Sequence, residues 1–178
     1  MKKTGQGILV LGGARSGKSR YALELASGFS RKTLIATLEP KDEEMAQRIA
    51  SHRRARGADW RVMEEPLKLN RALRQAEKNS RVIVVDCLTL WLSNLLLAGK
   101  KESEIILELE KLCQIISRPG VAIILVSNEV GQGIVPADPL TRRFRDLQGR
   151  ANQMLANVAD QVYLLVAGIP VRIKGDKG

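Results

Sequence analysis

The sequence predicts one α/β domain, built on a mostly parallel β-sheet that helices flank and that a C-terminal antiparallel hairpin extends. Short apolar runs alternate with helix-like stretches along all 178 residues, which is typical of a helix-covered sheet. Several of these runs are apolar at every position, as expected of strands buried on both faces. A glycine-rich loop joins the first run to the first helix-like stretch, so a phosphate-binding loop (P-loop) fold is predicted.

The expected elements follow one another in a regular β/α order. The predicted strands are Gly7–Leu11, Thr33–Thr37, Arg61–Met63, Val82–Asp86, Val121–Ser127 and Gln161–Val166. The predicted helices are Lys18–Ala26, Lys41–Arg56, Pro66–Lys78, Leu88–Ala98, Ser103–Ser117 and Pro139–Val158. A turn at 168–170 leads into a short final strand at 171–173, and 175–178 reads as a frayed tail. No linker or repeat divides 1–178, so a single nucleotide-binding domain is expected.

Composition narrows the class of protein. The formal net charge is +10, yet the basic residues are scattered and aromatic residues make up only 3% of the chain. Stacking platforms for nucleic acid are therefore scarce, and we expect sites for small anionic molecules instead. No apolar run approaches the length of a membrane span, and no signal peptide is evident, so a cytoplasmic protein is expected. Cys87 and Cys113 show no metal-binding spacing and are expected to be small, buried, apolar residues.

The loop after the first strand matches the pattern Gly, four residues, Gly-Lys-Ser/Thr. It consists of Gly12, Gly13, Ala14, Arg15, Ser16, Gly17, Lys18 and Ser19. In such a loop the backbone N–H groups and the helix N-terminus converge on phosphate oxygens. Lys18 is expected to reach the outer phosphates, and the Ser19 hydroxyl to ligate Mg²⁺. The loop predicts a nucleoside triphosphate as donor, without fixing the reaction.

Asp86 ends an apolar strand, where a carboxylate helps to hold Mg²⁺ in P-loop proteins. The carboxyl ends of parallel strands share one sheet edge, so Asp86 and Gly12 are expected in one crevice. The alternative is that Asp86 caps the helix that follows.

His52 is the only histidine in the chain. It shares a predicted helix face with Met45 and Ile49, and could be a histidine at the edge of the core. Several arginines surround it, however, and such a cluster suits a triphosphate and favours the neutral, nucleophilic imidazole. A lone histidine argues against a zinc site.

A loop with two glycines, a proline and the pair Asn128-Glu129 follows the fifth predicted strand. Its position suits a binding loop at the same sheet edge, although a plain connection is the alternative. On the next helix Leu140, Phe144 and Leu147 are expected in the core. Another face, with Arg142 and Asp146, is solvated, contacts a subunit or holds a polar substrate.

Taken together, the chain resembles the bifunctional adenosylcobinamide kinase / adenosylcobinamide-phosphate guanylyltransferase family. The resemblance rests on Gly12–Ser19, Ala36-Thr37, Arg48–Arg53 with Arg56 and Trp60, Glu64, Asp86–Thr89, Ser127–Gly131 with Gly133–Pro136, Phe144–Asp146, Gly149-Arg150 and Asn152-Gln153. The histidine helix and the Asn-Glu-Val-Gly loop are its most specific parts.

The resemblance implies two reactions. ATP or GTP phosphorylates the hydroxyl of adenosylcobinamide, and GTP then donates GMP to that phosphate through a guanylylated histidine, for which His52 is the matching position. Lys18 and Asp86 are the other implied catalytic residues. The nucleotide-binding positions implied beyond the P-loop are Ala36, Thr37, Leu38, Arg53, Arg54, Ala55, Arg56, Glu64 and Asp86.

Asn128, Glu129, Arg145 and Asp146 are candidates for contacts to the second substrate, and Glu129, Glu64 and Asp86 for the base. The resemblance also implies a homotrimer, while the composition predicts no nucleic-acid partner and the short apolar runs predict no membrane span. Three alternatives stay open at this point: a P-loop kinase of another acceptor without nucleotidyl transfer, a nucleic-acid-dependent ATPase, and a corrinoid-binding carrier without turnover.

Overall fold

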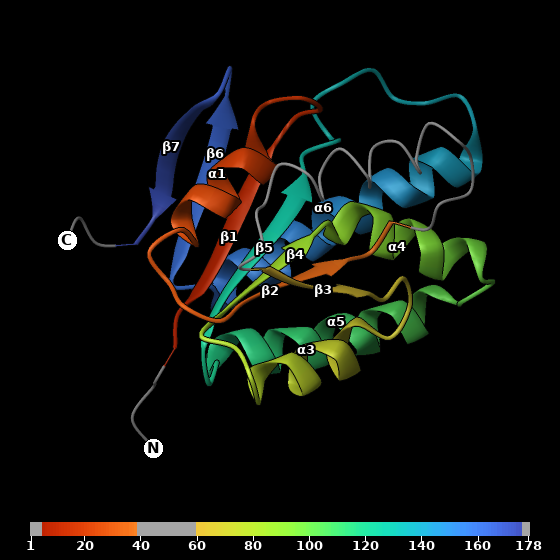
Figure 1. The fold of residues 1–178 in the computed structure, drawn as a ribbon. Helices are drawn as coiled ribbons and strands as arrows, with labels where there is room; N and C mark the ends of the chain where they lie inside the picture. The colour runs from red at the N-terminus through yellow and green to blue at the C-terminus, as the bar shows by residue number, and fades with distance from the viewer. Residues whose placement is uncertain (1–4, 39–59, 176–178) are drawn as a thin grey trace.

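The computed structural model describes residues 5–38 and 60–175, and these form a sheet with helices on both faces (Figure 1). The strands are β1 Gly7–Gly12, β2 Lys32–Ala36, β3 Trp60–Glu64, β4 Val82–Asp86, β5 Ala122–Asn128, β6 Gln161–Val166 and β7 Ile169–Lys174. The described helices are α1 Lys18–Leu25, α3 Leu69–Glu77, α4 Leu88–Leu97, α5 Glu102–Ser117 and α6 Pro139–Val158. The predicted helix at 41–56 lies outside the described residues.

The seven strands form one sheet in the order β3-β2-β4-β5-β1-β6-β7. All neighbours are parallel except β6 and β7, which pair antiparallel. The prediction of a parallel sheet with a C-terminal hairpin is therefore confirmed. The central strands β1, β4 and β5 are buried along almost their whole length, which explains their continuous apolar sequence.

Two cores lie on opposite faces of the sheet. One packs α3, α4, α5 and α6 against residues such as Leu9, Ile83 and Leu125. The other packs α1 against residues such as Val10 and Val84. Because β1 and β5 are neighbours whose following helices go to opposite faces, a crevice is expected beyond their carboxyl ends.

The structure differs from the predicted boundaries at two turns. The hairpin turn is Ala167-Gly168, both with positive φ (51° and 83°), and β7 starts directly after it. Two positive φ values are what a two-residue hairpin with right-handed strand twist requires. Pro170 is accommodated because β7 is an edge strand. Helix α3 begins at Leu69, three residues later than predicted, because the Glu65 carboxylate accepts the N–H groups of Leu67 and Lys68 (3.2 and 2.8 Å).

One predicted core residue is wrong: Leu140 is 53% exposed, whereas Leu147 and Ala151 on α6 are buried. Leu140 lies in the first turn of α6, before the helix reaches the sheet. Among residues 5–38 and 60–175, no helix is long and apolar enough to cross a membrane.

Candidate nucleotide site

The loop between β1 and α1 curls as a phosphate cradle requires. Gly12, Arg15 and Gly17 all have positive φ (152°, 55° and 96°), and the Ser16 N–H donates to the Gly13 carbonyl (3.3 Å). A Cβ atom on Gly12 would lie 2.6 Å from Ser16 Oγ and 2.7 Å from the Leu165 carbonyl. No side chain fits there, so the first glycine of the motif is required by close packing.

Lys18 lies at the start of α1, folded against the loop. Its ammonium donates to the Gly13 carbonyl at 2.5 Å, and the residue is only 7% exposed. Burial lowers the pKa of Lys18 from 10.5, while the neighbouring Cys87 and Asp86 side chains oppose that shift. The Lys18 ammonium is therefore close enough to the Asp86 carboxylate to be attracted by its charge, as expected of a cation that faces phosphates beside a carboxylate.

The hairpin turn supports the loop from behind. The Gly168 N–H donates to the Ser16 carbonyl (3.0 Å), and a Cβ on Gly17 would lie 3.3 Å from the Gly168 Cα. The two backbones therefore approach so closely that a Cβ at Gly17 would have to displace the turn slightly.

Three of the predicted site residues lie in register across neighbouring strands. Ala36 at the end of β2 pairs with Glu64 of β3 on one side and with Asp86 of β4 on the other. The structure therefore brings them to one edge of the sheet. The alternative role of Asp86 as a helix cap is not observed, because Cys87 occupies the N-cap of α4.

Thr37 anchors the segment after Asp86. This buried residue donates its hydroxyl to the Cys87 carbonyl (2.6 Å) and accepts the Cys87 N–H (2.9 Å). The Thr37 N–H donates to the Asp86 carbonyl (3.2 Å), and Asn94 of α4 donates to the Thr37 carbonyl (2.8 Å). The position of the Asp86 backbone is thus fixed by β2 and α4 together.

The Asn128-Glu129 segment is tied directly to the P-loop. The Glu129 N–H donates to the Gly12 carbonyl (2.9 Å), and the Asn128 N–H donates to Thr89 Oγ1 (2.8 Å). Asn152 Nδ2 of α6 donates to the Asn128 carbonyl (3.0 Å). The predicted binding loop therefore starts beside the cradle, at the carboxyl ends of β1 and β5.

A buried polar cluster on α6 holds this loop in place. Ser127 Oγ donates to Asn152 Oδ1 (2.7 Å), and Gln148 Nε2 donates to Ser127 Oγ (2.9 Å). All three residues are at most 5% exposed. The sequence alone does not predict this supporting role for any of the three. Gln148 and Asn152 lie four residues apart beside the apolar stripe of α6, and that spacing was the available signal.

The predicted substrate residues Arg145 and Asp146 precede Gln148 on that helix. Arg145 is half-buried and Asp146 is exposed. Asp146 lines a small polar hollow with Glu102, Arg143 and Arg150. Their roles stay predictions.

The donor set fits Mg²⁺ held mainly by phosphate. Among residues 5–38 and 60–175, no three His, Cys, Asp or Glu side chains gather as a metal cage. Mg²⁺ in nucleotide enzymes is typically bound by one or two protein groups plus phosphates and water, and Ser19 and Asp86 could supply those two. His52, Arg53, Arg54, Ala55 and Arg56 lie outside the described residues, so their predicted roles stay predictions.

Solved structures with this architecture confirm the fold. The RadB recombinase aligns with a TM-score of 0.50 at 17% identity, over 89% of this chain and 73% of that one. An ATPase from a type III secretion system of pathogenic bacteria aligns with a TM-score of 0.54 at 14% identity, over 90% of this chain and 51% of that one.

Relatives in sequence are more specific. The bifunctional adenosylcobalamin biosynthesis protein CobP of Pseudomonas aeruginosa is 46% identical over 94% of this chain and 97% of its own length. CobU of Escherichia coli, which carries the same descriptive name, is 41% identical over 94% of this chain and 99% of its own length. The family model described as "Cobinamide kinase / cobinamide phosphate guanyltransferase" matches residues 8–173. The P-loop, Asp86 and the Asn128-Glu129 loop at one sheet edge agree with this match. The chain belongs to the cobinamide kinase / cobinamide phosphate guanyltransferase family.

Proposed function

We propose that one triphosphate cradle serves two successive reactions of this chain. In the first, the γ-phosphoryl group of ATP or GTP passes to the hydroxyl of adenosylcobinamide. In the second, GMP passes from GTP to the new phosphate, giving adenosyl-GDP-cobinamide and pyrophosphate. The observation that carries the proposal is the convergence of the P-loop, Asp86 and the Asn128-Glu129 segment at the carboxyl ends of β1, β4 and β5.

In the kinase step the protein positions the triphosphate and neutralises its charge. The N–H groups of the cradle and the Lys18 ammonium are proposed to face the phosphates. Ser19 and Asp86 would hold Mg²⁺, which would supply positive charge beside the transferred group. Lys18→Ala and Asp86→Ala should both lose phosphorylation of adenosylcobinamide. Turnover near that of the wild type in either variant would contradict these roles.

In the guanylyl step His52 is the proposed nucleophile. One imidazole nitrogen forms a bond to the α-phosphorus of GTP, and the bond to the pyrophosphate leaving group breaks. A phosphate oxygen of adenosylcobinamide phosphate then attacks the same phosphorus and releases the histidine. Two displacements replace one difficult transfer. The arginines at 53, 54 and 56 are proposed to hold the triphosphate meanwhile.

The test uses GTP labelled at either the α- or the γ-phosphate. The wild type should acquire acid-labile label from the α-position only, and His52→Ala should acquire none. Label that persists in His52→Ala would refute the assignment. If His52→Ala also keeps full guanylyl transfer, the chain uses a different route; if the wild type phosphorylates but transfers no GMP, it is a kinase only. The homotrimer and the cytoplasmic location remain proposals that rest on the family resemblance.

A further inference from the structure

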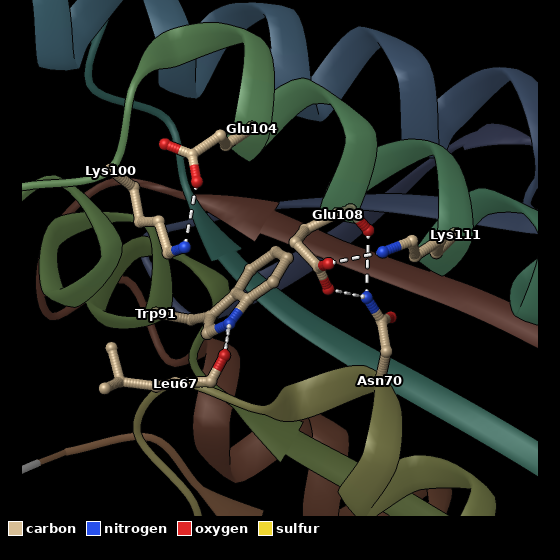
Figure 2. Close-up of polar contacts among 7 residues, drawn as sticks. All are labelled: Leu67, Asn70, Trp91, Lys100, Glu104, Glu108 and Lys111. Atoms are coloured by element: carbon tan, nitrogen blue, oxygen red, sulfur yellow. Dashed lines mark hydrogen bonds and ion pairs between the residues drawn. The ribbon is translucent and has the colours of Figure 1, made fainter. Parts of the chain in front are cut away.

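A second concave surface lies away from the nucleotide site, on the helix layer formed by α3, α4 and α5. It is a groove of about 740 Å³, and neither the P-loop nor Asp86 nor the Asn128-Glu129 loop lines it. Its apolar lining comes from Leu67, Leu95, Ala98, Ile105 and Leu107. Figure 2 shows its surroundings: the buried Trp91 donates its indole N–H to the Leu67 carbonyl (3.0 Å) and thereby fixes the segment at one end.

One wall of this groove carries a row of cations. Lys68, Arg71 and Arg74 line it along α3, from the N-cap to the last turn, and all three are exposed. Their spacing of three residues places them on one side of the helix, in a row about 9 Å long at the α-helical rise of about 1.5 Å per residue. Within the described part of the chain, no ion pair involves any of the three.

The opposite wall, on α5, has its charges already matched. Lys100 lies 2.9 Å from Glu104, and Lys111 lies 2.7 Å from Glu108 (Figure 2). Glu108 also accepts a hydrogen bond from Asn70 Nδ2 (2.8 Å). The groove is therefore asymmetric, with an apolar floor, a neutralised wall and a wall with three unmatched positive charges.

We propose that this groove docks an acidic amphipathic α-helix of a partner protein. Such a helix presents an apolar stripe to the groove, and carboxylates three or four residues apart along one flank. Those carboxylates repeat with the same rise as the cations of α3, so several pairs form at once. A single-headed amphiphile would use one cation of the row. Self-association of the chain through this groove is an outcome that the test below distinguishes.

The test uses a synthetic probe and the full chain. The probe is a fluorescein-labelled helical peptide of about 18 residues, long enough to hold helical structure. It has leucines along one stripe and glutamates along one flank. Fluorescence anisotropy should show saturable binding that weakens as salt rises. A peptide with glutamine in place of glutamate should lose most of the affinity.

Two groove variants and one matched control locate the site. Arg71→Glu places a like charge against the peptide and should weaken binding at least about tenfold. Leu107→Asp should do the same, and because Leu107 is 54% exposed the fold should tolerate it. Arg118→Glu makes the same charge change at an exposed residue at the end of α5, outside the groove, and should alter binding little. All three variants should keep the kinase activity of the wild type, which separates this surface from the proposed function.

Four outcomes would overturn the proposal. These are absence of saturable peptide binding, equal weakening by Arg118→Glu and Arg71→Glu, self-association of the chain that Leu107→Asp abolishes, and Arg71-dependent binding to vesicles of anionic lipid without binding to the peptide.

Discussion

Replacing Thr37 by valine tests how the Asp86 segment is held. Valine keeps the branched shape of threonine but removes the hydroxyl that contacts both the N–H and the carbonyl of Cys87. The Cys87 carbonyl retains the N–H of Trp91 (3.2 Å), whereas the Cys87 N–H has no such second partner among the described contacts. An unpaired part-buried donor costs about 1–3 kcal/mol, and the lost second bond adds about 1 kcal/mol.

The expected loss is therefore about 2–4 kcal/mol, which lowers the Tm of a domain of this size by about 5–15 °C. Because Asp86 directly precedes Cys87, the affinity for GTP and Mg²⁺ should fall as well. Urea unfolding followed by circular dichroism and titration with a fluorescent GTP analogue measure the two effects. Thr37→Ser, which keeps the hydroxyl, should restore both.

Thr33→Val is the matched control for this experiment. Thr33 is also buried and lies on β2, near the end opposite Thr37, and its hydroxyl lies 2.7 Å from Ser80 Oγ. Ser80 keeps the Ala76 carbonyl as a partner (2.7 Å), so only about 1 kcal/mol should be lost, without any change in GTP affinity. If Thr37→Val is no more destabilised than Thr33→Val and binds GTP as the wild type does, the reasoning is wrong.

Two further predictions follow from the pKa shifts. Burial lowers the pKa of Lys18 in the folded chain. Between that value and 10.5 the unfolded chain therefore binds more protons than the folded chain does. The free energy of unfolding of the wild type, measured with urea relative to Lys18→Met, should therefore rise as the pH is raised toward about 10. If the stability of the wild type relative to Lys18→Met stays constant or falls as the pH is raised, the burial of a charged Lys18 is contradicted. Burial raises the pKa of the Cys87 thiol to about 11, which lowers the fraction of the reactive thiolate. In a Cys113→Ser background, iodoacetamide at about pH 8 should therefore modify Cys87 roughly a hundredfold more slowly in the native chain than in the unfolded chain. Equal rates would show that the thiol is not shielded.

The sequence predicted the parts of the molecule that local chemistry dictates. Val82–Asp86 is recognisable because a strand buried on both faces is apolar at every position, and Gly12–Ser19 because phosphate binding demands glycines and a lysine at fixed spacing. Gln148 could not be placed in this way, because a buried glutamine and a solvated one look alike until the helix is packed against Ser127. The hairpin turn was placed one residue late because Ala167, which has a Cβ, adopts a conformation that is usual for glycine or asparagine.

The support that the Gly168 turn gives the phosphate loop has a consequence for the order of folding. Strand β1 lies between β5 and β6, and Asp160 Oδ2 accepts the Gly7 N–H (2.7 Å). Strand β1 thus finds both of its neighbours only after more than half of the 178 residues have followed it. Contacts this distant in sequence slow folding, because loop closure precedes them. The phosphate loop is therefore supported on all sides only after β6 and β7 have been made, so a nascent chain should gain nucleotide affinity only once this hairpin has been synthesised.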